Sequence, residues 1–428
     1  MAFVPRIACL RPSRTQTQLI SVAIGGAGRR NSRLSLCRAT HGTASSTDAG
    51  VLAGSGVPLP PPGSAATSPV WRSSSVVEKY AKMPFTRVTL EELLQMGETH
   101  DLVSSARFAR DELPKRMARR VKALQNLPFI VGVNPHIKSI YDLYHDSLGA
   151  LLALPEPVDG PSQAVFTEEL RKLVGAHQEV IPVLAKGFKE CGKYMTKDAK
   201  TMFLDNMIHA RIGIRVIAEH HLSLATPSPA YIGVVNTRLS PAVLITSVAN
   251  YVRDLCELNY GGVAPEFVVA GHTDTLIAYI GVHLEYIFME ILKNAMRATV
   301  EFSSRTGRIE HPPVEIVVCK SDEEVVIRVR DQGGGISQKD LGHIWDYSYT
   351  TVPKYDDDTD SIFDTQARMG MQAGSGGPMA GLGFGLPMSR IYAKYFQGSL
   401  EIRSIEGYGC DVFLRVPNIL GSSHVIED

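Results

Sequence analysis

Glu290-Ile-Leu-Lys-Asn294-Ala-Met-Arg297-Ala lies within a helical pattern of apolar residues that runs from Leu284 to Phe302. Glu290 and Asn294 are four residues apart, so a helix places them on the same face. A carboxylate can accept a proton from a reacting hydroxyl, and an amide oxygen suits Mg²⁺, which keeps most of its waters. Lys293 and Arg297 can balance phosphate charge. Taken alone, the pattern also fits an ordinary amphipathic helix with a surface asparagine.

Two glycine-rich boxes follow in order. The first, Asp331-Gln-Gly333-Gly334-Gly335, places a carboxylate at the end of a predicted strand, where it can accept a hydrogen bond from the exocyclic amine of adenine. Its glycines permit positive φ and close backbone approach. The second, Gly381-Leu-Gly383-Phe-Gly385-Leu386, opens a predicted helix, so free backbone N–H groups can face phosphate. Each box alone is a weak signal, but the order and spacing of the three segments predict an ATP site.

From Glu266 onward the pattern alternates between strands and helices. A helix is expected from Leu386 to Phe396. Strands are expected over Phe267–Ala270, Val314–Cys319, Val325–Arg330, Leu400–Ser404 and Cys410–Val416. This order predicts a mixed sheet with helices on one side, an α/β sandwich. The polar segment 351–381 is predicted to be a lid or binding loop.

Residues 80–256 carry apolar side chains at three- and four-residue spacing, which is typical of helices. Helices are expected over Leu90–Leu94, Phe108–Leu127, Ile137–Leu154, Thr167–Lys186 and Lys200–Leu224. Prolines and short breaks between them predict a four-helix bundle. The chain is therefore predicted to be an α+β protein, with an N-terminal four-helix bundle in residues 78–256 and an α/β sandwich ATP-binding domain in residues 262–420.

The first 75 residues differ in composition from the rest. Between Met1 and Thr47 there are seven arginines and no acidic residue. This composition is typical of an organelle transit peptide, with a disordered basic tail as the alternative, and residues 41–75 read as a flexible linker. Over the whole chain 44 basic residues balance 44 acidic ones, and no apolar run approaches the roughly 18 residues of a membrane span. We therefore expect neither a nucleic-acid partner nor a membrane span.

The three ordered segments resemble those of the GHKL superfamily, which groups gyrase-type ATPases, heat-shock chaperones, mismatch-repair ATPases, sensor histidine kinases and mitochondrial 2-oxoacid dehydrogenase kinases. The similarity is greatest to the mitochondrial kinases. The matching segments are Arg107–Arg120, Thr237–Pro241, Glu290–Thr299 and Gly383–Gly398. The resemblance covers roughly residues 80–418 and implies that the sandwich is of the GHKL type.

Within that family the chain resembles the branched-chain 2-oxoacid dehydrogenase kinases, with the pyruvate dehydrogenase kinases as the alternative. Segments 126–135 and 346–351 are similar to the branched-chain branch. Tyr286 stands where pyruvate dehydrogenase kinases usually carry histidine. The chain departs from the family pattern at Ala380 and Leu382, which puts the contacts of the lid in question.

The resemblance implies an ATP-dependent protein-serine kinase of the mitochondrial matrix, which phosphorylates and inactivates the E1α subunit of the branched-chain complex. It implies that Glu290 is the general base, with Lys293 beside it, that Asn294 holds Mg²⁺ and that Asp331 binds adenine. Further implied nucleotide contacts are Arg297, Gly333, Gly335, Thr350, Thr351, Gly381, Gly383, Gly385 and Leu386. A structural K⁺ would have ligands from Ile344, Asp346, Tyr349, Gly383 and Leu386. The helical bundle would dock the lipoyl domain of the transacylase E2 core, and the protein would be a homodimer.

Two other classes remain as alternatives. A sensor histidine kinase needs a phosphoacceptor histidine on a dimerising helix, usually followed by an acidic residue and proline, and the helical histidines lack that context. They are His177, His209, His220 and His221. A GHKL ATPase clamp usually carries its ATPase domain first and a transducer domain after it, whereas here the ATP-binding pattern comes last.

Overall fold

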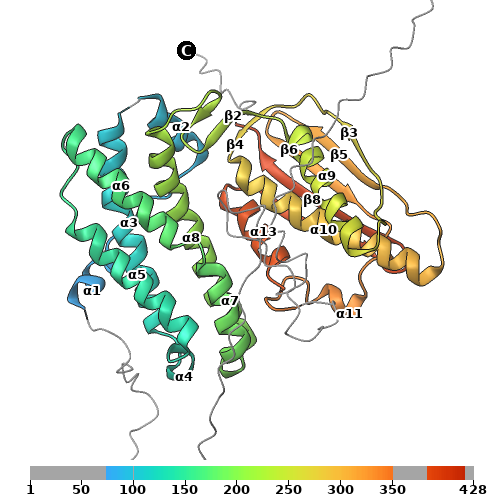
Figure 1. Ribbon diagram of the computed structural model, residues 1–428, viewed down its shortest axis with the longest axis horizontal. Coiled ribbons are helices and arrows are strands. Elements are labelled where there is room, and N and C mark those ends of the chain that lie inside the picture. Colours follow the sequence, from blue (N-terminus) through green and yellow to red (C-terminus); the bar gives the residue numbers. More distant parts are fainter. Residues whose placement is uncertain (1–73, 100, 350–382, 420–428) are drawn as a thin grey trace, which may run out of the picture. The chain divides into compact units, whose positions relative to one another are not determined.

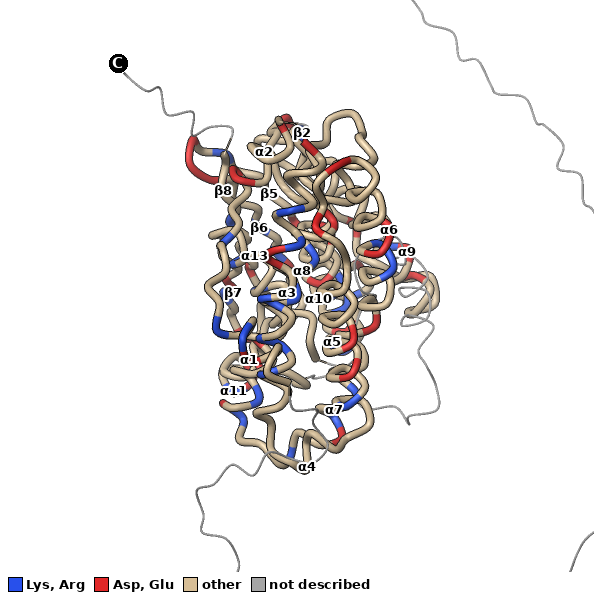
Figure 2. Tube along the Cα trace, turned by 90° about the vertical axis from the view of Figure 1, so that its left-hand side faces the viewer, with Lys and Arg blue, Asp and Glu red and all other residues tan. Residues whose placement is uncertain are grey.

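The computed structural model describes residues 74–99, 101–349 and 383–419. The predicted transit peptide therefore lies outside the described residues, as do Thr350, Thr351 and Gly381 of the predicted nucleotide site. Figure 2 shows Lys and Arg interspersed with Asp and Glu along the described helices and strands, in keeping with the balanced charge of the chain. No helix in the described ranges combines the length and the apolarity that crossing a lipid bilayer requires.

The N-terminal half of the described chain is helical (Figure 1). Its helices are α1 (Ser75–Lys82), α2 (Leu90–Glu98), α3 (Leu102–Gln125), α4 (Phe129–Gly132), α5 (Pro135–Ala153), α6 (Gly160–Ala176), α7 (Val180–Cys191) and α8 (Lys197–Leu224). Helix α3 packs against α5, α6 and α8, and α5 also packs against α7. These contacts form a bundle of four helical columns. Three are α3, α5 and α8, and the fourth is made of α6 followed by α7.

The predicted helix Thr167–Lys186 is wrong as a single element, because the chain breaks between α6 and α7. The carbonyl of His177 accepts a hydrogen bond of 2.8 Å from Nη2 of Arg211, and the carbonyl of Gln178 accepts one of 3.2 Å from the same nitrogen. Buried carbonyls at a helix end need such donors. The donor comes from α8, so local periodicity could not indicate the break.

The C-terminal half contains a five-stranded mixed sheet. Its strands, in spatial order, are β3 (Phe267–Gly271), β5 (Val314–Lys320), β6 (Glu324–Arg330), β8 (Gly409–Pro417) and β7 (Ser399–Ile405). Strands β3 and β5 are parallel, and the other pairs are antiparallel. Ile327 lies opposite Val318 on one side and Leu414 on the other. All three side chains are fully buried, so the predicted alternation marks the core face.

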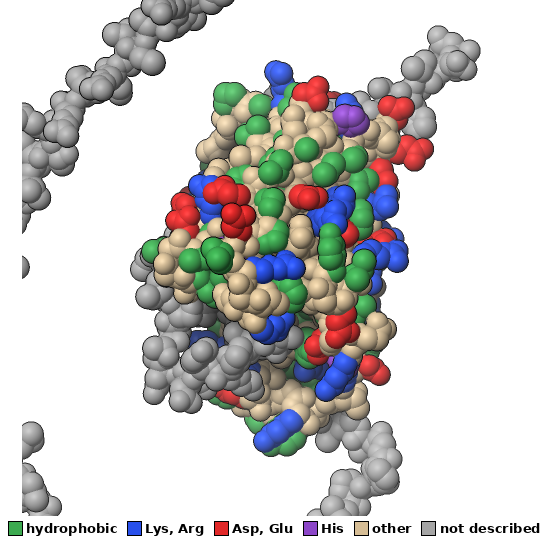
Figure 3. All heavy atoms as spheres, turned by 90° about the vertical axis from the view of Figure 1, so that its right-hand side faces the viewer, with side chains coloured by type: hydrophobic (Ala, Val, Ile, Leu, Met, Phe, Trp, Pro, Cys, Tyr) green, Lys and Arg blue, Asp and Glu red, His purple; other side chains and the backbone are tan. Residues whose placement is uncertain are grey.

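Three helices cover that face of the sheet (Figure 1). They are α9 (Pro241–Asn259), α10 (Gly281–Thr306) and α13 (Gly385–Tyr395). Helix α10 packs between α9 and α13 and touches β6, and α13 touches β7 and β8. The prediction of an α+β protein, a helical region followed by an α/β sandwich, is confirmed. On the molecular face shown in Figure 3, hydrophobic side chains are separated by charged and polar ones.

A second, three-stranded sheet was not predicted. It joins β1 (Tyr231–Ile232), β2 (Val235–Leu239) and β4 (Ile277–Tyr279). Strands β1 and β4 have two and three residues, too few to show a period of two, and β2 carries three polar residues in succession, Asn-Thr-Arg. Helix α9 begins inside segment 78–256, which we predicted as the bundle, and ends beyond it at Asn259, yet it packs chiefly on α10. The domain boundaries stay predictions.

Candidate functional site

The carboxylate of Glu290 and the ammonium of Lys293 form a buried ion pair on α10. The residues are one turn apart on a helix of 26 residues. Nζ of Lys293 lies 2.6 Å from Oε1 of Glu290, and the two side chains are only 9% and 8% exposed. Lys and Glu are almost never buried without a partner. The pair therefore holds a carboxylate and its counter-ion inside the domain.

The second glycine box meets this carboxylate at Gly385. A Cβ atom at that position would lie 2.0 Å from Oε2 of Glu290, so only glycine leaves room for the carboxylate. Gly385 is also the first residue of α13, and the cap residue Phe384 makes no side-chain hydrogen bond to it. The start of α13 thus lies beside Glu290, and the N–H groups of a helix start suit an anion, although Pro387 in this turn has none.

Asn294 and Arg297 lie on α10 just beyond the buried pair, and both are half-buried. Nε of Arg297 lies 3.8 Å from Oε1 of Glu301, a partly exposed pair that leaves the guanidinium otherwise accessible. Within the described residues the side-chain amide of Asn294 makes no hydrogen bond, so its oxygen is available to a ligand or metal. A neutral oxygen next to the pair is the donor type that Mg²⁺ accepts.

Asp331 is the second buried carboxylate of the site, and among the described residues no cation lies beside it. Its Oδ1 accepts hydrogen bonds from the backbone N–H groups of Gly333 at 2.8 Å and Cys410 at 3.3 Å. Burial raises the pKa of the Asp331 carboxyl to about 6, although these two N–H groups act in the opposite direction. Oδ2 has no hydrogen bond within the described residues, which leaves one acceptor free for a ligand amine.

The first glycine box packs directly on α10. A Cβ atom at Gly333 would lie 2.5 Å from Cβ of Ala298, and one at Gly335 would lie 2.2 Å from the carbonyl oxygen of Ile405. Gly335 also has φ +68°, a left-handed conformation that favours glycine. The box is thus wedged between α10 and the β7–β8 turn. The Asp331 box, which is separate in the sequence, therefore packs on the same helix that carries Glu290.

The residues of the predicted potassium site are only partly brought together. Gly383 has φ +69°, and a Cβ there would lie 2.4 Å from the carbonyl oxygen of Tyr349. The carbonyl of Gly383 accepts from the N–H of Ser348 at 3.1 Å. The carboxylate of Asp346 is engaged by Nζ of Lys197, 2.7 Å away, and by Nδ1 of His343. Ile344 and Leu386 lie on the flanking segments. The described ranges contain no group of three or more His, Cys, Asp or Glu placed to hold a metal ion.

Some contacts of the site could not be found from the sequence. Cys410 contributes a backbone N–H to Asp331 from 79 residues away. The hydroxyl of Tyr347 donates a hydrogen bond to Asp205 of α8, which lies 142 residues earlier in the chain. A backbone donor leaves no residue-type signal. The only signal of the segment around Tyr347 in the sequence is its family resemblance.

Two family models match the chain. Residues 87–236 match "Mitochondrial branched-chain alpha-ketoacid dehydrogenase kinase", and residues 280–419 match "Histidine kinase-, DNA gyrase B-, and HSP90-like ATPase". The second match contains the Glu290 helix, the Asp331 box and the described part of the second glycine box.

Relatives cover most of the chain. A mitochondrial pyruvate dehydrogenase (acetyl-transferring) kinase of Arabidopsis thaliana is 34% identical over 353 residues, which span 80% of this chain and 93% of that protein. Its counterpart in Schizosaccharomyces pombe is 29% identical over 82% of this chain and 97% of that protein. Isozyme 1 of the mouse kinase is 29% identical over 79% of each chain.

Proposed function

The chain belongs to the family of mitochondrial 2-oxoacid dehydrogenase kinases, and we propose that it transfers the γ-phosphoryl group of ATP to a serine of a dehydrogenase E1α subunit. The observation that carries this proposal is the buried Glu290–Lys293 pair set against the start of α13. It offers a proton acceptor, a cation and the start of a helix within one site.

In the proposed step the serine Oγ attacks the γ-phosphorus of ATP. The bond from that phosphorus to the bridging oxygen of the β-phosphate breaks, ADP leaves, and the hydroxyl proton passes to the carboxylate of Glu290. Lys293 keeps that carboxylate oriented through the 2.6 Å contact. Asp331 accepts a hydrogen bond from the adenine amine through Oδ2, and the N–H of Gly333 holds the other oxygen of the same carboxylate.

The free amide oxygen of Asn294 fits a magnesium ion. Bound there, Mg²⁺ would neutralise charge on the phosphates during transfer. Arg297, whose guanidinium is partly exposed, can contact the same phosphates. The proposed roles of Gly383, Gly385 and Leu386 are backbone contacts at the start of α13. Those of Thr350, Thr351 and Gly381 rest on the family resemblance alone.

Pyruvate dehydrogenase E1α is the first candidate acceptor. The relatives in Arabidopsis, fission yeast and mouse are named as pyruvate dehydrogenase kinases, whereas our expectation of branched-chain specificity is not confirmed. The branched-chain E1α stays the second candidate for two reasons. The helical region matches a family model of that description, and Tyr286 is fully buried on α10 one turn before Glu290.

One assay separates these candidates. The purified protein is incubated with Mg-ATP and each E1α at equal concentration, and initial rates of labelling are compared. Faster labelling of pyruvate dehydrogenase supports the first candidate, and faster labelling of the branched-chain enzyme supports the second. The phosphate should be acid-stable, as a serine ester is. An acid-labile label would instead support the histidine-kinase alternative, and a failure to label either E1α would refute the proposal.

The remaining parts of the proposal concern location, partners and ions. Mitochondrial location is supported by the relatives, and we propose the matrix as the compartment. Fusing residues 1–75 to a reporter tests import, and a cytosolic reporter would refute it. We further propose that the bundle docks the lipoyl domain of E2 and that the protein is a homodimer, testable by co-sedimentation and light scattering. The K⁺ proposal predicts a higher rate in KCl than in NaCl at equal ionic strength.

A further inference from the structure

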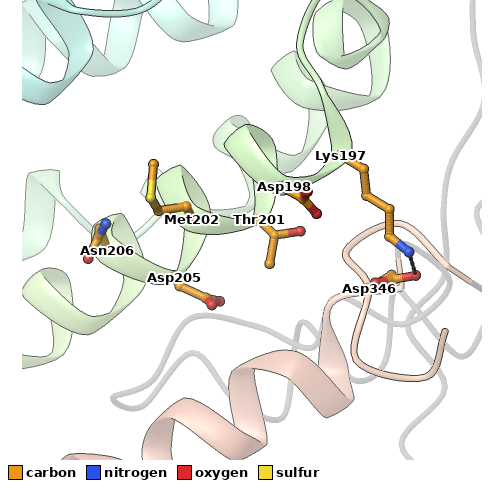
Figure 4. Close-up of a pocket in the computed structure, with 7 residues that line it drawn as sticks. All are labelled: Lys197, Asp198, Thr201, Met202, Asp205, Asn206 and Asp346. Carbon is orange, nitrogen blue, oxygen red and sulfur yellow. Dashed lines mark ion pairs between the residues drawn. The ribbon is translucent and has the colours of Figure 1, made fainter. Parts of the chain in front are cut away.

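Helix α8 and the segment 343–349 enclose an open hollow of about 480 Å³ (Figure 4). Its lining residues are Lys197, Asp198, Thr201, Met202, Asp205, Asn206 and Asp346. Six of the seven belong to the first half of α8, a helix of the bundle. The hollow therefore marks a place where the bundle meets a segment next to the nucleotide site.

Three polar contacts join α8 to this segment: one is made by Tyr347, and two are made by Nζ of Lys197, to Asp346 and, at 3.3 Å, to Nδ1 of His343. The hydroxyl of Tyr347 donates to Oδ1 of Asp205 at 2.5 Å. Nζ of Lys197 lies 2.7 Å from Oδ2 of Asp346, the ion pair drawn in Figure 4. The Lys197 side chain is more than half exposed, so its ion pair contributes little. The Tyr347 bond is different because the tyrosine is buried.

Tyr347 is only 3% exposed, which makes its hydroxyl costly to leave without a partner. Burial, together with the hydrogen bond to Asp205, raises the pKa of Tyr347 well above its ordinary value. The phenol therefore stays protonated and acts as the donor. The contact directs a neutral donor at a carboxylate, a geometry that gives a strong hydrogen bond.

The ring of Tyr347 connects this bond to the start of α13. Its centroid lies 4.9 Å from that of Phe384, whose side chain is 1% exposed. Phe384 immediately precedes Gly385, the residue that packs against the carboxylate of Glu290. A shift of Tyr347 would displace Phe384, because buried aromatic rings have little free volume around them. The displacement would reach the contact between Gly385 and Glu290.

We propose that Tyr347, held by Asp205 of α8, is a positioning residue for Glu290, so that the helical bundle sets the geometry of phosphoryl transfer through the start of α13. The inference deepens the proposed kinase function and rests on it. Asp205 and Tyr347 touch neither ATP nor the acceptor in this scheme. They act through Phe384 and Gly385 on a carboxylate that must lie within hydrogen-bond reach of the serine hydroxyl.

The test uses the full-length protein and four single variants. Tyr347→Phe keeps the ring against Phe384 and removes the donor. Asp205→Ala removes the acceptor, while Asp205→Asn keeps an acceptor oxygen of the same size. Thr201→Ala is the matched control, because Thr201 lines the same hollow one turn earlier on α8. The turnover number with E1α and the dissociation constant for ATP are measured for each, with the melting temperature as a check on folding.

Tyr347→Phe and Asp205→Ala should each lower turnover about tenfold, the worth of one hydrogen bond to a charged group, with ATP affinity changed less than about twofold. Asp205→Asn should recover most of the rate, and Thr201→Ala should match wild type. The double variant Tyr347→Phe/Asp205→Ala should be no slower than either single variant.

Full activity in Tyr347→Phe, or a loss in Asp205→Asn as large as in Asp205→Ala, would overturn the positioning role. A loss in Thr201→Ala equal to that in Asp205→Ala would do the same, because the effect would then belong to packing of α8. If wild-type protein labels no E1α, the kinase proposal itself fails. That outcome differs from a wild type that labels E1α at the same rate as its variants, which refutes the positioning role alone.

Discussion

The two buried carboxylates of the candidate site are held in different ways. Glu290 has the ammonium of Lys293 at 2.6 Å, whereas the partners of Asp331 among the described residues are two backbone N–H groups, and burial raises the pKa of Asp331 to about 6. A counter-ion offsets the desolvation of a charge, while two dipoles offset it only in part. The difference assigns them to different tasks: a carboxylate beside a cation suits chemistry on phosphate, and a carboxylate held by backbone N–H groups, with one oxygen left as an acceptor, suits recognition of an amine.

The largest expected effect separates chemistry from binding on α10. Glu290→Gln keeps the size and hydrogen-bonding capacity of the side chain and removes the base. Turnover should fall roughly 10²–10⁴-fold, the usual worth of general acid–base catalysis, while ATP affinity stays nearly intact. Single-turnover labelling of E1α and calorimetric titration with ATP measure the two quantities.

Asn294→Ala provides the contrast to that variant, because loss of the proposed metal ligand should remove Mg-ATP binding and transfer together. Near-normal transfer in Glu290→Gln would make Glu290 structural, and positioning with Mg²⁺ alone would then be the better account.

The second prediction breaks the ion pair itself. Lys293→Met leaves the Glu290 carboxylate buried without a cation and should cost about 3–5 kcal/mol of unfolding free energy. The double variant Glu290→Gln/Lys293→Met should recover most of that loss, because no charge is then left buried. Guanidinium denaturation of the four proteins gives the comparison. Equal stability of the single and double variants would mean that the pair does not compensate a buried charge.

The ion pair and the Asp331 box also show which parts of this site local sequence can indicate. Spacing alone predicted that Glu290 and Asn294 share a helix face, and alternation of Val325, Ile327 and Val329 predicted the core face of β6. These are features of period 3.6 and period 2, which depend only on neighbours along the chain. The fold class and the paired strands follow from them.

Features that depend on distant residues were not predictable in this way. The break at His177 requires Arg211, and the contact of Tyr347 requires Asp205. The backbone N–H of Cys410, which completes the hydrogen bonding of Asp331, carries no residue-type signal at all. Long-range donors to buried carbonyls and carboxylates are decided by packing, and one sequence does not encode them as a local pattern.

The third prediction tests the recognition role of Asp331. Asp331→Asn keeps an acceptor and the shape of the side chain but presents an amide that can point its NH₂ towards the adenine amine. ATP affinity should fall about 10–100-fold, the cost of leaving a buried polar group poorly paired, with turnover at saturating ATP little changed. Titration with ATP and steady-state rates at high ATP separate the two. A fall in turnover at saturating ATP as large as that in Glu290→Gln would contradict the proposed assignment of Asp331 to binding and Glu290 to chemistry.

The smallest expected effect follows from the raised pKa of Asp331. The charged form accepts the adenine amine, and a group with a pKa of about 6 loses that form as pH falls through 6. At pH 5 roughly one carboxyl in ten is ionised, so ATP affinity should be up to about tenfold weaker than at pH 7. The phosphates of ATP also titrate in this range, and Asp331→Asn supplies the control because it retains that effect and lacks the carboxyl. The difference between the two pH profiles isolates Asp331. Parallel profiles would show that its charge does not contribute to adenine binding, and the contrast with Glu290 would then rest on geometry alone.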